Sequence, residues 1–198
     1  MPQLPFKNFR TKIFTSSRSK ATINDKPPDN ILLNMKRLWN THASLIRQVT
    51  LSITSDDPNQ ITPINCLLLN QKDLGIDLGQ YYGWKCSDRY RQLLTVCIDI
   101  ILRIIAYILY QQDITEYMFE LYLSLDSICN FMCETIKGLD SYEMKRLLYT
   151  YIETTVEEIK FIVDKQYLRS NLHYNVCMEQ SQKIATYIAI HINKNNNP

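Results

Sequence analysis

A four-residue block recurs along this chain at a nearly constant spacing, and this repeat constrains the fold more than any other feature of the sequence. The letters MKRL stand at residues 35–38 and again at 144–147, and the related letters YRQL stand at 90–93. The three starts are separated by 55 and 54 residues. Self-similarity at a fixed period is the signature of a supersecondary unit that is used several times.

Each unit also carries two positions that the repeat brings together. The first position comes four residues after a repeat leucine, so the helix face that buries the leucine also carries it. These first positions are His42, Cys97 and Tyr151. The second positions follow 28, 27 and 29 residues later and are Asn70, Ser124 and Gln180. A helix, a turn and a returning helix would place the two side by side, which predicts a buried polar cluster of these six residues.

The composition favours helices throughout. Only 4 of the 198 residues are Gly, which leaves few residues for tight turns or phosphate-binding loops. After residue 28, apolar residues recur at three-and-four spacing. We therefore expect an all-α protein, a six-helix bundle made of three related helical hairpins over residues 29–193. The expected helices span about 29–55, 58–79, 87–112, 113–138, 140–165 and 170–193, with a loop at 80–86.

Start signals accompany several of these helices. Asp29 or Asn30 can cap the first helix, and Pro58 suits the first turn of the second. Capping boxes are predicted where Asp113 precedes Glu116 and where Asp140 precedes Glu143.

The two ends of the chain differ from the rest. In residues 1–28, five Lys or Arg residues precede the first acidic residue, Asp25. We interpret this segment as a disordered basic arm. The alternatives are an arm that binds nucleic acid or another anionic surface, and a cleaved organelle-targeting peptide. Residues 194–198 are expected to form a disordered tail.

The six cysteines lie mostly within apolar helical patterns, which favours buried thiols in a reducing compartment over disulfides. Cys129 and Cys133 share one helix face, but zinc would need two further ligands, so we place both in the core. The apolar run at 96–110 is shorter than the roughly 20 residues that span a bilayer. No signal-peptide pattern precedes it. We expect an intracellular, cytoplasmic protein without a membrane span.

Three segments resemble a family of small uncharacterised helical proteins found in bacteria. They read LWxxHxxLxR at 38–47, LLNQxDLG at 68–75 and YYG at 81–83. The family pattern reads approximately LWxxHxxxTR, LLxNQxDIG and YYG. The resemblance spans residues 31–192 and implies a helical fold. It implies no activity, because the family has none established.

This chain departs from the family pattern where that pattern carries further histidines. Cys97 and Tyr151 stand in their place in the third and fifth helices, and Gln180 aligns with another in the sixth. Converging histidines would suit a metal ion, and this chain keeps only His42 among them. The many Asn, Ile, Lys and Tyr residues are typical of an AT-rich genome, such as that of a large DNA virus. A viral origin would place the protein in the host cytoplasm or in the virion.

His42 is the one candidate metal ligand or general base, although we favour a buried core histidine bonded to a neighbour such as Asn70. Cys97 would need to ionise to act as a nucleophile, which an apolar setting opposes. The acidic stretch Glu153, Glu157 and Glu158 is assigned to a solvated helix face, with Lys160 as the partner of Glu157.

The aromatic residues Tyr81, Tyr82 and Trp84 cluster in the expected loop. They form a candidate interaction site, because exposed aromatic residues dominate protein interfaces. The alternative is that they close the end of the bundle.

The sequence carries no P-loop, nucleophile elbow, dinucleotide fingerprint or HExxH motif. We therefore predict a non-catalytic structural or protein-interaction protein that needs no cofactor and binds an unknown protein partner or a second copy of itself. One alternative is a metal-binding or redox protein centred on His42. The other is a nucleic-acid-associated protein that uses the N-terminal arm.

Overall fold

The computed structural model describes residues 30–196, and within that range the chain forms six helices and no strand. The helices are α2 (Ile31–Thr54), α3 (Ile61–Tyr82), α4 (Trp84–Leu109), α5 (Thr115–Thr135), α6 (Ser141–Val163) and α7 (Tyr167–Asn196). The predicted all-α, six-helix bundle is confirmed. The predicted basic arm at 1–28 lies outside the described residues.

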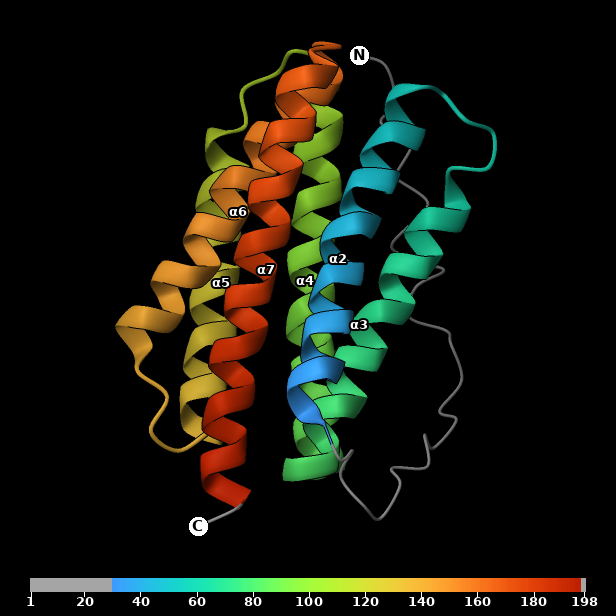
Figure 1. The fold of residues 1–198 in the computed structure, drawn as a ribbon. Coiled ribbons are helices and arrows are strands. Elements are labelled where there is room, and N and C mark those ends of the chain that lie inside the picture. Colours follow the sequence, from blue (N-terminus) through green and yellow to red (C-terminus); the bar gives the residue numbers. More distant parts are fainter. Residues whose placement is uncertain (1–29, 197–198) are drawn as a thin grey trace.

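Consecutive helices run in opposite directions and pack as three hairpins, α2 with α3, α4 with α5 and α6 with α7 (Figure 1). Helix α3 also packs against α4, and α7 packs against α2, so the six helices close into a ring. Helix α6 contacts both α2 and α4 across the interior. The closed arrangement allows every helix to bury one apolar face.

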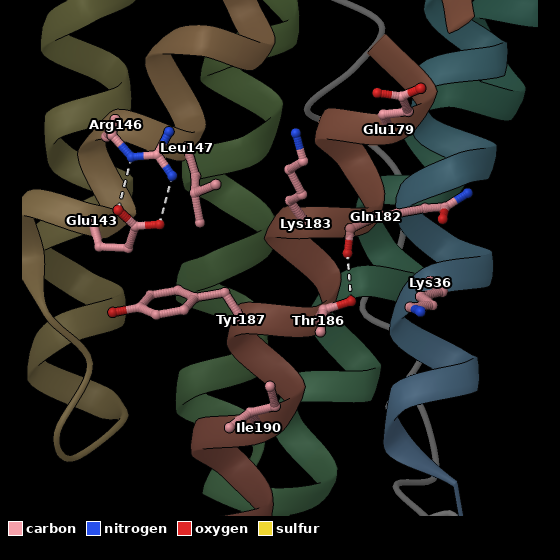
Figure 2. Close-up of a pocket in the computed structure, with 10 residues that line it drawn as sticks. All are labelled: Lys36, Glu143, Arg146, Leu147, Glu179, Gln182, Lys183, Thr186, Tyr187 and Ile190. Carbon is pink, nitrogen blue, oxygen red and sulfur yellow. Dashed lines mark hydrogen bonds and ion pairs between the residues drawn. The ribbon is translucent and has the colours of Figure 1, made fainter. Parts of the chain in front are cut away.

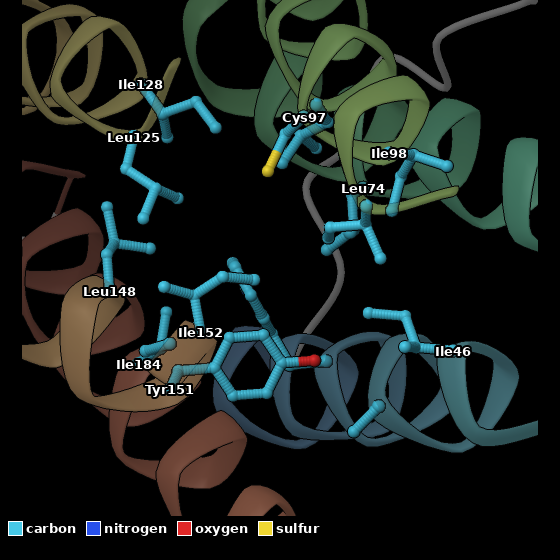
Figure 3. Close-up of a cluster of buried hydrophobic side chains, with 14 of the residues drawn as sticks. Ile46, Leu74, Cys97, Ile98, Leu125, Ile128, Leu148, Tyr151, Ile152 and Ile184 are labelled. Carbon is cyan, nitrogen blue, oxygen red and sulfur yellow. The ribbon is translucent and has the colours of Figure 1, made fainter. Parts of the chain in front are cut away.

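All six helices contribute to one core (Figure 3). The side chains that meet there include Ile46, Leu74, Ile98, Ile128, Ile152 and Ile184, one from each helix. The same register of burial recurs in the three hairpins, because Met35, Tyr90 and Met144 are all buried at the repeat starts. Apolar three-and-four spacing therefore sets which face of each helix points inward.

The junction between α3 and α4 is much shorter than the predicted loop at 80–86. Helix α3 continues to Tyr82, and α4 begins at Trp84, so Gly83 alone separates them. Gly83 has a φ of 85°, a region that glycine enters without steric cost. One such residue is enough to reverse the chain, which is why the neighbouring aromatic residues are helical.

Several helix starts also differ from prediction. Helix α3 begins three residues after Pro58, and Pro63 occupies its first turn instead. The Asp113 carboxylate accepts a hydrogen bond from the Thr115 backbone N–H at 3.0 Å, so it forms a local turn rather than the predicted capping box with Glu116.

Two caps are confirmed. The Asn30 side chain accepts from the Leu33 N–H at 3.0 Å at the start of α2. The Asp140 side chain accepts from the Glu143 N–H at 2.8 Å at the start of α6. The reciprocal half of the predicted capping box is not formed, because the Asp140 N–H donates to the Tyr187 hydroxyl and the Glu143 carboxylate binds Arg146. At the other end of the chain, α7 begins at Tyr167 and extends to Asn196, so residues 194–196 are helical and not part of a disordered tail.

Helices α3 and α4 approach each other closely at Gly75. A Cβ atom at this position would lie 2.7 Å from the Ser87 carbonyl oxygen and 3.1 Å from the Arg91 Cβ. The absence of a side chain at Gly75 therefore permits the close packing of the two helices.

Helix α4 is the one described helix that is long and apolar enough to cross a membrane, by length and composition alone. It has 26 residues and is therefore longer than the apolar run at 96–110, which the sequence predicts to be too short to span a bilayer. In the bundle it packs against α3, α5 and α6, and Asp99 forms an ion pair with Arg103 at 2.5 Å.

Candidate functional site, a buried polar network

His42 and Tyr151 meet in the interior of the bundle. The His42 Nδ1 atom lies 2.9 Å from the Tyr151 hydroxyl oxygen, a contact between helices α2 and α6. Trp39 packs on both, with its ring centroid 5.5 Å from that of His42 and 6.0 Å from that of Tyr151. His42 is only 5% exposed, and burial lowers its pKa to about 4. The imidazole is therefore neutral at physiological pH.

The other predicted cluster residues have different partners. The Asn70 amide donates to the Leu38 carbonyl oxygen at 3.1 Å, one turn before His42, rather than to the His42 ring. Burial raises the pKa of Cys97 to about 12, and a hydrogen bond with Ser124 opposes this shift. Gln180 is only half-buried. The structure therefore joins His42 to Tyr151 and Cys97 to Ser124, and it forms no Cys–His pair between Cys97 and His42.

A second set of contacts surrounds Arg47, five residues beyond His42 on α2. Its guanidinium donates to the Glu158 carboxylate at 2.5 Å and to the Ser170 hydroxyl at 3.1 Å. It also donates to the Asn171 side-chain oxygen at 2.5 Å and lies over the Tyr174 ring, 4.8 Å from the centroid. Arg47 therefore connects α2 to both α6 and α7.

Glu158 is the buried member of this ion pair, with a side chain that is 3% exposed. Burial raises its pKa, and the hydrogen bond and positive charge of Arg47 act in the opposite direction. Our assignment of Glu158 to a solvated face was therefore wrong. The neighbouring pair was placed correctly, because Lys160 bonds Glu157 at 2.7 Å on the surface.

The two sets of contacts are linked along α6. The Thr155 hydroxyl lies 3.6 Å from the Cys177 sulfur, and Cys177 also forms a hydrogen bond with Glu158. Tyr151, Thr155 and Glu158 are spaced four and three residues apart, so they line one face of the helix. That spacing is the sequence signal that could have placed Glu158 inside.

A further buried carboxylate, Asp77 on α3, was also missed. Its Oδ1 accepts from the Asn34 amide at 2.5 Å, whereas its buried Oδ2 has no hydrogen-bond partner. Burial raises the pKa of Asp77 to about 6, and Asn34 and the charge of Arg37 limit the shift. Asp77 stands seven residues after Asn70 on the buried face of α3, which is the same sequence signal.

The aromatic residues at the α3–α4 junction divide into two kinds. The Tyr82 hydroxyl accepts from the Asn195 amide at 3.3 Å, which ties the end of α3 to the end of α7. Tyr81 is also partly buried, and burial raises its pKa to about 12. Trp84, in contrast, is 66% exposed.

A shallow surface groove of about 570 Å³ lies along α6 and α7 and reaches Lys36 on α2 (Figure 2). Its charged residues have both signs, and Arg146 is already bonded to Glu143 at 2.7 Å. No His or Cys side chain lines the groove.

Within residues 30–196, no group of three or more His, Cys, Asp or Glu side chains is arranged to hold a metal ion. His42 itself has Tyr151 as its polar partner.

No family model, curated protein or solved structure matches this chain.

The buried His42 should make the protein sensitive to acid. Its pKa is about 4 in the folded state against an ordinary value of 6.5, so the unfolded chain binds the proton more readily. The difference in pKa contributes up to about 3 kcal/mol to the free energy of unfolding. This contribution is complete above pH 6.5 and is lost as the pH falls through 4. We expect His42→Gln to cost about 1–3 kcal/mol at pH 7 and to flatten this acid limb in urea unfolding curves. Tyr151→Phe, the control, should keep the limb, and parallel curves for His42→Gln and the parent would refute the assignment.

Asp77 should act in the opposite direction. Its folded pKa of about 6 exceeds the ordinary value of 3.8, so the folded state favours the protonated acid. Ionisation therefore costs stability as the pH rises from 3.8 through 6. Asp77→Asn keeps an acceptor for Asn34 without the charge, and we expect it to raise the free energy of unfolding by about 1–3 kcal/mol at pH 7. The gain should shrink towards pH 4, and an equal difference at both pH values would contradict this explanation.

Proposed function

We propose that this protein is a non-catalytic interaction protein that binds a protein partner through one end of its helical bundle. The proposal rests on which side chains of the protein are buried and which are exposed. The polar groups of the interior are buried and bonded to one another, whereas several large apolar groups are exposed on the surface, three of them at one end of the bundle.

The interior supports a structural role for the polar residues. His42 is bonded to Tyr151, and Glu158 is bonded to Arg47. Burial raises the pKa of Cys97 to about 12, so the thiol stays protonated and unreactive. A catalytic site needs such groups to face a substrate, and these groups face one another.

The end of the bundle where α2, α4 and α6 begin supports the interaction role. Each of these helices exposes a large apolar side chain in its first turn, namely Leu33, Trp84 and Tyr142. We call these three residues the end face. Leu33 and Tyr142 occupy the same position in the repeat, two residues before Met35 and Met144. Exposed aromatic residues supply much of the affinity of protein interfaces, so Trp84 is the expected anchor.

Affinity capture of the full chain from the cells that make it, with quantitative mass spectrometry, tests this role. We expect Trp84→Ala to lose the specifically captured protein while the thermal midpoint stays unchanged, because the side chain is exposed. Phe119→Ala is the matched control, since Phe119 is 64% exposed on α5, away from the end face. This control should retain the partner. Equal capture by both variants would exclude the end face as the binding surface.

A further inference from the structure

Two cysteine sulfurs lie close together near the surface of α5. The Cys129 Sγ and the Cys133 Sγ are 3.9 Å apart, on successive turns of the helix. Cys129 is buried, and its thiol also lies 3.5 Å from the Ser141 carbonyl oxygen. Cys133 is partly exposed, so the pair can be reached from solvent. The polar network around His42 and Arg47 does not include either thiol.

The helix holds this pair in a geometry that disfavours a disulfide. Residues four apart on a helix have Cβ atoms about 5–6 Å apart, whereas a disulfide requires about 3.5–4.5 Å. Direct oxidation of Cys129 and Cys133 to each other would therefore require α5 to distort. A group that bridges the two sulfurs has no such requirement.

A metal ion bonded to both sulfurs does fit the spacing. At bond lengths of roughly 2.3 Å, typical of zinc–thiolate bonds, sulfurs 3.9 Å apart give a bond angle of about 115°. A rotation that separates the sulfurs by a further ~0.7 Å would make the arrangement linear. The bent geometry uses the sulfur separation that the structure already has.

The ligand set selects the kind of ion. Zinc takes four ligands in structural sites, and no third His, Cys, Asp or Glu joins this pair within the described residues. Thiolates are soft ligands that favour Cu(I), an ion that is stable with few ligands. We propose that Cys129 and Cys133 form a binding site for one soft monovalent cation, with Cu(I) as its natural occupant.

The proton and charge balance of this binding step is simple. Cu(I) forms two Cu–S bonds as two S–H bonds break, and both protons pass to solvent, with no change in oxidation state. The resulting site carries one negative charge. Burial raises the pKa of Cys129 to about 12 and also raises that of Cys133, so the two protons leave only because the copper ion competes with them for the sulfurs. The positive charge of Lys145 on α6, whose ammonium lies 2.8 Å from the Asp126 carboxylate, acts against both pKa shifts.

The test is an anaerobic titration of the full chain with Cu(I) held by a competing chromophoric chelator. A Cys66→Ser background removes the exposed thiol, which could otherwise bind copper on the surface. We expect one Cu(I) to be withdrawn from the chelator per chain, with release of two protons in weak buffer. Cys133→Ser and Cys129→Ala should each abolish this binding while the circular dichroism spectrum stays helical.

Cys86→Ser is the matched control, because Cys86 is also a half-buried thiol but pairs with Thr135 rather than with another cysteine. This variant should still bind one Cu(I). Retained binding in Cys133→Ser, or the failure of the parent to compete with the chelator, would overturn the proposal. Rapid formation of a Cys129–Cys133 disulfide by a mild oxidant in the folded chain would overturn it as well.

Discussion

The ion pair between Arg47 and Glu158 is the interaction on which the arrangement of the helices depends. The two residues are 111 positions apart, and the carboxylate is almost completely buried. An apolar core tolerates many similar packings, because hydrophobic contacts have no direction. A buried charge needs one partner at one position, and leaving it unpaired costs several kcal/mol. It therefore does not tolerate alternative packings. The pair therefore selects one register of the first hairpin against the third.

Two further polar contacts act at the same boundary. The contact between His42 and Tyr151 joins α2 to α6 about one and a half turns from Arg47, and the Ser181 hydroxyl donates to the Asn40 side chain at 3.0 Å between α7 and α2. No comparable buried ion pair is present between the first and second hairpins among residues 30–196. There the close approach of α3 and α4 at Gly75 provides the specificity through shape. Polar contacts therefore position the first hairpin against the third, and the close packing of α3 and α4 positions the first hairpin against the second.

The sequence was sufficient to predict the number of helices, their antiparallel pairing and the inward positions of the apolar residues, because each follows from local apolar spacing. It was not sufficient to predict the partners of the buried polar groups. Glu158 resembles its neighbours Glu153 and Glu157 in sequence, and only the fold brings Arg47 beside it. The one-residue junction at Gly83 was also missed, because one positive φ replaced the expected seven-residue loop.

A double-mutant cycle on Arg47 and Glu158 tests the central claim most directly. Arg47→Met leaves the buried Glu158 carboxylate without its partner, so it should lower the free energy of unfolding by about 3 kcal/mol. Glu158→Leu should cost less, because Arg47 is partly exposed and keeps its contacts with Ser170 and Asn171. The double variant replaces both by apolar groups, and it should lose much less than the two single losses together. A coupling free energy of more than about 1 kcal/mol is the predicted result. Additive losses, with no coupling, would show that the pair does not hold the two hairpins in register.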